Sequence, residues 1–128
     1  MITVTFFTEG LAGSKEEGSG LVGFRAIGHA GYADSGSDIV CAGVTAILKT
    51  AANGLTEVLG CKAHVHTDTN RGYLRVRLDG AYRKVNDLEV LEKVDTLMKV
   101  ARLGISGIAE QYPEYVTLDT KAYTDSRA

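Results

Sequence analysis

Five short stretches of the chain alternate apolar with polar residues, which is the pattern of a half-buried β-strand. The clearest is 73–79, where Leu74, Val76 and Leu78 are separated by tyrosine, arginine and aspartate residues. The stretches 2–7, 21–29, 63–68 and 116–119 show the same period of two. Because one face of the clearest stretch is polar, we expect a sheet that is covered on one side only, which is typical of antiparallel pairing.

Two longer stretches place apolar residues at three- and four-residue steps, the spacing of one face of an α-helix. The first starts after Asp38, whose carboxylate can accept the free N–H groups of a first helical turn, and it stops at Gly60. The second begins near Asn86, which forms a capping-box pattern with Glu89, and it runs to about Gln111. Pro113 forbids further helix.

The predicted element order is therefore β-β-α-β-β-α-β. Two hairpins, each followed by a helix, indicate a two-layer α+β domain, with a mainly antiparallel sheet and both helices on one of its faces. We expect a single domain over residues 1–120 and a disordered polar C-terminal tail over 121–128. The glycine-rich segment Glu9–Gly20 is expected to be a flexible loop.

Composition narrows the class of protein. A chain of 128 residues with 45% apolar and 23% charged residues is ordinary for one soluble domain with a real core. The net charge of −2 argues against a protein whose main role is phosphate binding, so no direct nucleic-acid binding is expected. The chain has two cysteines, no basic-then-apolar N-terminal segment and no stretch of 18 apolar residues, so we expect a cytoplasmic protein without a membrane span.

Candidate chemistry gathers around a glycine-rich loop between the second strand and the first helix. His29 stands at one end of this loop and Cys41 at the other, so an imidazole could take the thiol proton and leave a reactive thiolate. Cys41 falls in the first helical turn, where the partial positive charge of the helix favours a thiolate. Asp38 is expected to cap that helix or to orient His29. From spacing alone, a small buried structural cysteine remains the more common role for Cys41.

The loop itself offers a place for a substrate. Gly28, Gly31 and Gly36 could let the backbone approach a bound peptide, although each could equally be an ordinary turn glycine. Tyr32 is the only large apolar anchor of the segment 30–37, which we expect to act as a lid. These four residues form the predicted substrate-binding loop.

The sequence gives less support to other candidate sites. His64 and His66 share one strand face near Cys61, but a structural metal site needs four ligands and no fourth is nearby, so we expect neither a metal nor another cofactor. Phosphate-binding and serine-hydrolase motifs are absent from the sequence. A modest basic cluster is interpreted as a solvated strand face rather than an RNA site. Its members are Arg71, Arg75, Arg77, Arg83 and Lys84.

The loop sequences carry a family resemblance. Gly-His-Ala-Gly-Tyr at 28–32 and Gly-Ser-Asp-Ile-Val-Cys-Ala at 36–42 resemble the ribosomal-processing cysteine protease family, called Prp, and the similarity extends from Met1 to about Asp119. The chain departs from the family pattern in three places. The Glu9–Gly20 segment is longer than usual, and Gly43 and Thr45 stand where alanine and serine are expected. These differences affect loop shape and substrate fit more than chemistry.

The resemblance implies a cysteine endopeptidase with Cys41 as the nucleophile and His29 as the general base. Similar proteins are cofactor-free homodimers that remove a short N-terminal extension from ribosomal protein twenty-seven of the large subunit, cutting after paired aromatic residues, a step needed for ribosome maturation. The alternative is a non-catalytic dimeric protein that binds a ribosomal protein or peptide, with His29 and Cys41 merely packed.

Overall fold

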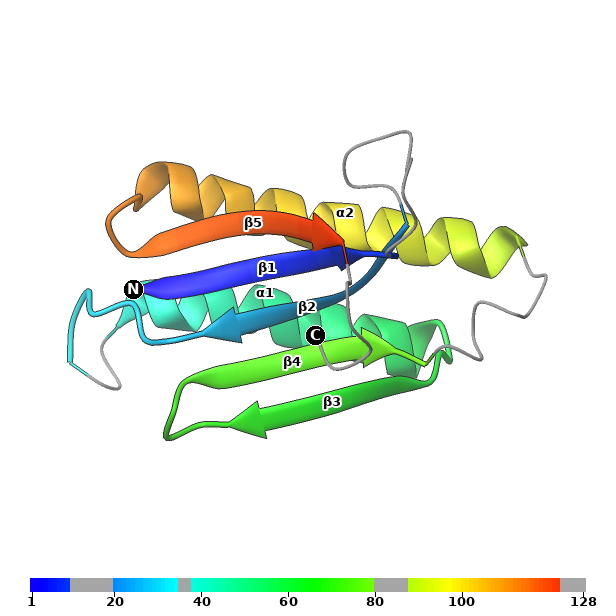
Figure 1. Ribbon diagram of the computed structural model, residues 1–128, viewed down its shortest axis with the longest axis horizontal. Coiled ribbons are helices and arrows are strands. Elements are labelled where there is room, and N and C mark those ends of the chain that lie inside the picture. Colours follow the sequence, from blue (N-terminus) through cyan, green and yellow to red (C-terminus); the bar gives the residue numbers. More distant parts are fainter. Residues whose placement is uncertain (10–19, 35–37, 80–87, 123–128) are drawn as a thin grey trace.

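The computed structural model describes residues 1–9, 20–34, 38–79 and 88–122, and these residues form a sheet layer and a helix layer (Figure 1). The elements follow the predicted order, with one helical turn added after the first helix. In chain order they are β1 (Ile2–Thr8), β2 (Leu21–Ile27), α1 (Ile39–Asn53), the π-helical turn η1 (Gly54–Val58), β3 (Ala63–Asp68), β4 (Tyr73–Leu78), α2 (Leu88–Gln111) and β5 (Val116–Ala122). The predicted α+β fold class is confirmed.

The five strands form one mixed sheet in the order β3-β4-β2-β1-β5. β1 pairs antiparallel with β2, β2 with β4, and β4 with β3, whereas β5 runs parallel to β1. The register places Val4 beside both Ala26 and Leu118. The sheet is therefore mainly antiparallel, as predicted, and its first strand lies in the interior.

The core lies between one face of the sheet and the two helices, which both cover that face (Figure 1). The strands contribute every second residue, including the fully buried Phe6 and Phe24, whose rings are 5.4 Å apart. The helices contribute their apolar stripes, with Leu48 of α1 and Met98 and Ile105 of α2 fully buried. The apolar residues that alternate along the strands and those that form a stripe on each helix thus make up the two sides of one core.

The two helices approach each other closely at Gly54. A Cβ atom there would lie 2.7 Å from Cδ1 of Leu97, so the glycine leaves room for α2. At this point α1 widens into η1, and the helical segment ends before Gly60, which has a φ of 68° and serves as the predicted stop. The predicted capping box at Asn86 lies outside the described residues.

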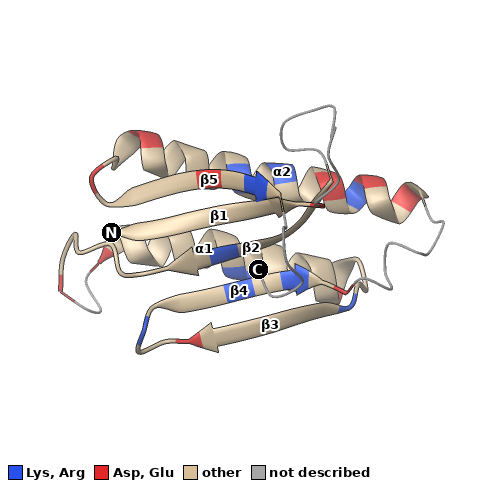
Figure 2. Ribbon diagram, viewed as in Figure 1, with Lys and Arg blue, Asp and Glu red and all other residues tan. Residues whose placement is uncertain are grey.

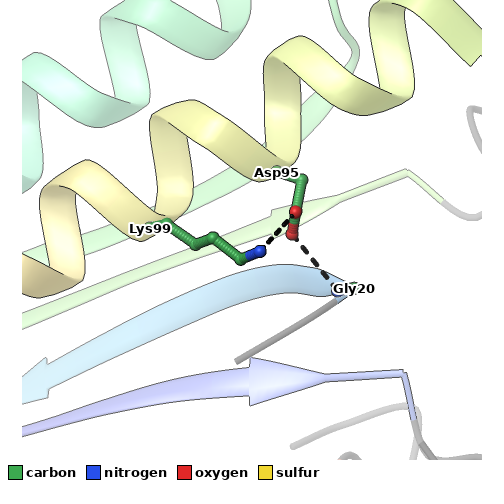
Figure 3. Close-up of polar contacts among 3 residues, drawn as sticks. All are labelled: Gly20, Asp95 and Lys99. Atoms are coloured by element: carbon green, nitrogen blue, oxygen red, sulfur yellow. Dashed lines mark hydrogen bonds and ion pairs between the residues drawn. The ribbon is translucent and has the colours of Figure 1, made fainter. Parts of the chain in front are cut away.

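Charged side chains of both signs occur on the strands and on the helices (Figure 2). On the strands, Arg75 and Arg77 are half-buried on the face of the sheet that the helices leave open. Acidic residues gather in the first turns of α2, where Asp95 accepts a hydrogen bond from the Gly20 N–H at 3.3 Å and pairs with Lys99 at 2.9 Å (Figure 3). Asp95 thereby joins α2 to the start of β2.

Some of the predicted segments lie wholly or partly outside the described residues. β5 reaches Ala122, so it includes the first two residues of the expected tail, and 123–128 lie outside the described residues. Most of the expected Glu9–Gly20 loop (10–19) and the basic residues Arg83 and Lys84 also lie outside them.

One helical segment is more apolar on average than a count of consecutive apolar residues indicates. The segment Ile39–Val58 is long and apolar enough to cross a membrane by length and composition alone, with a mean hydropathy of 1.4. Counting uninterrupted apolar residues missed it, because Thr45, Lys49 and Thr50 interrupt an otherwise alanine- and valine-rich run. The core helix of a soluble protein passes the same test, and Val44, Leu48 and Leu55 of this segment are buried against the sheet and α2.

Candidate active site

Cys41 lies in the first turn of α1, where its thiol is partly exposed. The backbone N–H of Ala30 donates a hydrogen bond to Sγ at 3.2 Å. This contact brings the segment that follows His29 against the start of the helix, although the two are 11 positions apart in sequence. The sulfur therefore lies beside a backbone donor of the loop and at the N-terminal end of a helix.

Asp38 is the N-cap of α1, as predicted, and its carboxylate holds two segments together. Oδ1 accepts the N–H groups of Val40 and Cys41 at 3.0 and 2.9 Å. Oδ2 accepts those of Tyr32 and Ala33 at 3.1 and 3.5 Å. Burial by itself raises the pKa of Asp38, but these backbone hydrogen bonds, together with one from the Cys41 thiol, outweigh it and leave the pKa below its ordinary value. Asp38 is therefore ionised at neutral pH.

The loop after His29 is anchored by an aromatic cluster. The ring of Tyr32 makes edge-to-face contacts with Tyr112 and Tyr115, with ring centroids 5.6 and 5.3 Å apart. Tyr112 and Tyr115 lie between α2 and β5, at the end of the molecule where β1 begins. Residues 30–34 are thus docked through both the Tyr32 ring and the backbone bonds to Asp38. The rest of the predicted lid, 35–37, lies outside the described residues and includes Gly36.

His29 follows the end of β2 and is exposed. The turn between β3 and β4 supports its backbone, because the Gly28 N–H donates to the Gly72 carbonyl at 2.8 Å. Gly28 has a φ of 101°, and a Cβ atom there would collide with the Met1 carbonyl oxygen, so only glycine fits. No hydrogen bond joins the His29 ring to the Cys41 thiol within the described part of the chain.

The side chains of His29 and Cys41 nevertheless both line each of two adjoining cavities. The larger, about 840 Å³, opens towards the loop and is also lined by Gly31, Asp38 and Asn70. The smaller, about 270 Å³, extends along α1 towards the sheet. Its walls include the apolar side chains of Ala26, Val44, Leu48, Tyr73 and Leu74. The site is thus a cleft with a thiol and an imidazole where its two parts meet.

The structure also adds residues that the sequence did not single out for the site. Thr45 lies one turn after Cys41 and lines both cavities, so the four-residue helical step could have identified it. Thr69, Asn70 and Gly72 come from the β3–β4 turn. No signal in the sequence placed this turn at the site, because its position depends on which strands are neighbours in the sheet.

The weaker candidates do not converge. Cys61 is buried, whereas His64 is exposed and lies 3.4 Å from Asp79, and the His66 ring contacts Tyr73. Within residues 1–9, 20–34, 38–79 and 88–122, no group of three or more histidine, cysteine or acidic side chains could hold a metal ion.

Residues 1–117 match the family model described as cysteine protease Prp. The chain belongs to the cysteine protease Prp family. It is 27% identical over 101 residues to the ribosomal processing cysteine protease Prp of Bacillus subtilis, which covers 79% of this chain and 87% of that protein. Membership in this family makes the chain a cysteine protease.

Two similar solved structures agree with this assignment. The ribosomal processing protease Prp of Staphylococcus aureus, in complex with a covalently linked product peptide, is 26% identical with a TM-score of 0.74 and covers 94% of this chain and 100% of its own. A Streptococcus mutans protein is 30% identical with a TM-score of 0.73 and covers 96% of both chains. The Prp fold therefore extends over nearly the whole of this chain.

Proposed function

We propose that this Prp-family protease cleaves a peptide bond with Cys41 as the nucleophile and His29 as the general base. The observation that carries the proposal is the cleft in which these two side chains share the walls of both cavities, with the Ala30 N–H directed at the Cys41 sulfur. Among the described residues the imidazole makes no hydrogen bond to the thiol, but catalytic hydrogen bonds are often long or poorly aligned before substrate binds.

The reaction then follows the chemistry of a thiol and an imidazole. His29 takes the Cys41 proton, and the thiolate attacks the carbonyl carbon of the scissile bond. The tetrahedral intermediate collapses, the C–N bond breaks, and the imidazolium gives its proton to the leaving amine. Water, deprotonated by His29, attacks the resulting thioester, and the acid product leaves as the thiol is reformed.

Stabilisation of the oxyanion needs a donor that is not already engaged. The N–H groups of Val40 and Cys41 are bound to the Asp38 side chain, and that of Ala42 is bound to the Asp38 carbonyl. These helix-start N–H groups are therefore not free to bind the oxyanion in this arrangement. The Ala30 N–H is better placed, because it contacts the sulfur that bonds to the scissile carbonyl carbon, and the oxyanion forms on the oxygen of that same carbon.

For the substrate, we propose the N-terminal extension of ribosomal protein twenty-seven of the large subunit, with cleavage contributing to ribosome maturation. Relatives of this chain are named ribosomal processing proteases, and one is known with a covalently linked product peptide. The apolar smaller cavity, which begins at Cys41, suits an aromatic side chain beside the scissile bond. Such a substrate places the enzyme in the cytoplasm, and we propose that it works there as a homodimer.

Two measurements test the proposal. Incubation with the large-subunit ribosomal protein from the same cell should give a product whose mass has fallen by that of the extension. Iodoacetamide at neutral pH should label Cys41 before Cys61, which is buried. An unchanged mass with a folded enzyme would reject the substrate, and equal labelling of the two cysteines would reject an activated Cys41.

A further inference from the structure

The imidazole of His29 has no side chain that orients it. Among the residues that the structure describes, it forms no hydrogen bond or ion pair, and the nearby carboxylate of Asp38 is engaged by four backbone N–H groups. A general base nevertheless has to be held in a defined orientation to remove a proton efficiently. In the structure, the turn between β3 and β4 supports His29 instead.

Gly72 in that turn lies against the backbone of Gly28, the residue before the histidine, and close to the ring of His29. Its carbonyl accepts the Gly28 N–H at 2.8 Å, and its own N–H donates to the Thr69 carbonyl at 3.2 Å, which closes the turn. A Cβ atom at Gly72 would lie 2.6 Å from the Gly28 carbonyl oxygen and 2.9 Å from Nε2 of His29. Both distances are shorter than real Cβ atoms show, so the imidazole has its place only because position 72 carries no side chain.

We propose that Gly72 is a positioning residue for the protease, which sets the place of the His29 imidazole by a hydrogen bond to the preceding residue and by steric contact with the ring. This inference rests on the proposed role of His29 as the general base. A side chain at position 72 has to displace the Gly28 carbonyl, the imidazole or both, so the ring leaves the place that it has in the wall of the cleft. The fold away from the cleft has no reason to change.

The test compares Gly72→Ala with Gly60→Ala. The two glycines have nearly the same positive φ, 62° and 68°, so alanine meets similar backbone strain at both. They differ in their surroundings, because a Cβ atom at Gly60 has no neighbour within 4 Å. We expect Gly72→Ala to lower kcat by about tenfold to a hundredfold, as a misplaced catalytic group does. Gly60→Ala should cleave like the parent enzyme.

The rate at which iodoacetamide alkylates Cys41 provides a second measurement. A substitution that only destabilised the fold would not change the pH dependence of this rate. Gly72→Ala should slow this alkylation near neutral pH and shift its pH profile towards that of an unassisted thiol, while Cys61 stays protected and reports an intact fold. In a His29→Ala background the second substitution should have no further effect, because the ring through which Gly72 acts is gone.

The outcomes are distinct. If His29→Ala leaves cleavage and alkylation unchanged, the proposed function fails and this inference fails with it. If His29→Ala impairs both but Gly72→Ala behaves like Gly60→Ala, or slows alkylation equally without His29, only the inference is overturned. If Gly72→Ala does not fold, a measurement on the parent protein still tests the inference. Nuclear Overhauser effects between the His29 ring and the Gly72 Hα protons are expected, and their absence also overturns the inference.

Discussion

The carboxylate of Asp38 connects the segment that carries Cys41 with the loop that follows His29. One oxygen caps α1 and the other accepts the N–H groups of Tyr32 and Ala33. A single buried side chain therefore fixes the entry to the helix and the docked form of the loop. The contribution of Asp38 to the site is therefore structural.

Replacing Asp38 by asparagine separates these two connections. Asparagine caps a helix well, but its amide nitrogen cannot accept the N–H groups of Tyr32 and Ala33. We expect Asp38→Asn to lower the free energy of unfolding at pH 7 by about 1–3 kcal/mol, the range for a hydrogen bond to a charged group. Urea denaturation measures this loss. Asp95→Asn is the control, because Asp95 also binds a distant backbone N–H but lies away from the cleft and should leave cleavage unchanged.

The pH dependence of that loss follows from the lowered pKa of Asp38. A carboxylate whose pKa is lower in the folded state stabilises the fold fully above its unfolded-state pKa, and the stabilisation is lost as the pH falls through the folded-state pKa. The difference between the parent protein and Asp38→Asn should therefore shrink below about pH 4. An equal difference at pH 7 and pH 3 would contradict an ionised, hydrogen-bonded Asp38.

The two cysteines give a second prediction at this scale. Cys41→Ala should lower kcat by at least about three orders of magnitude, as removal of a nucleophile does. The fold should remain, because alanine favours a helix and fills most of the same space. Cys41→Ser should be nearly as inactive, since a hydroxyl is much harder to ionise than a thiol. Cys61→Ala serves as the control, and substantial cleavage by either Cys41 variant would remove the nucleophile assignment.

Residue chemistry explains which of these roles were visible in the sequence. The cap at Asp38 and the place of His29 and Cys41 in one cleft could be predicted, because a cap and a loop of limited length are local features. Gly72 could be predicted only as a turn residue, since its contact with His29 depends on β2 and β4 being neighbours. The engagement of the helix-start N–H groups by Asp38 also went unnoticed, although the capping prediction itself contained it.

Among the elements, the loop 30–34 has the most direct bearing on access to the cleft. Its backbone is tied to Asp38, and Tyr32 holds it to the tyrosines between α2 and β5. A loop docked in this way can open only by breaking the aromatic contacts and the two backbone bonds. Opening and closing of such segments commonly gates substrate entry and excludes water from the reaction.

Removing the Tyr32 ring should loosen this loop. Edge-to-face aromatic pairs contribute about 0.5–1.5 kcal/mol each, so Tyr32→Ala should speed amide hydrogen exchange at positions 32 and 33 by roughly tenfold. Tyr32→Phe keeps both ring contacts and should exchange like the parent. Exchange that is unchanged in Tyr32→Ala would mean that Asp38 alone holds the loop, and exchange raised equally in both variants would implicate the hydroxyl group.

The elements themselves were largely predictable, because each has a period that the sequence displays. The first helical segment and β4 show the clearest patterns, and both were placed to within a residue or two when α1 and η1 are taken together. The π-helical turn at Gly54–Val58 was not foreseen, since it accompanies the close contact of Gly54 with Leu97 of another helix. Pairing of β5 with β1 was likewise unpredicted, because periodicity determines which face of a strand is buried but not which strand lies next to it.

At the scale of the whole molecule, part of α2 remains uncovered. Val100 and Leu103 are 64% and 73% exposed on its outer side, and a Cβ atom at Gly107 one turn further on would meet nothing within 4 Å. An exposed apolar helix face with a small residue is suited to close packing against a second copy of the chain. It supports the proposed homodimer.

Sedimentation at micromolar concentration tests this assembly. We expect a mass of twice 13.6 kDa for the parent protein and a shift towards the single-chain mass for Leu103→Asp, because a buried, unpaired carboxylate opposes association. Val58→Asp places the same charge at another exposed apolar position, on η1, and should leave the dimer intact. A parent protein that sediments as a single 13.6 kDa species would refute the homodimer.

The parallel pairing of β1 with β5 has a consequence for how the enzyme is made. The Ile2 N–H donates to the Tyr115 carbonyl, and the hydroxyl groups of Thr3 and Thr117 meet across a sequence separation of 114 residues. Contacts between such distant residues are slow to form, because a long loop has to close first. During synthesis β1 emerges from the ribosome long before its partner and waits with one edge unpaired. Gly28, the residue before His29, packs closely against the Met1 carbonyl oxygen, so the position of β1 bears on the cleft. The cleft is therefore completed only after β5 has been translated and has paired with β1.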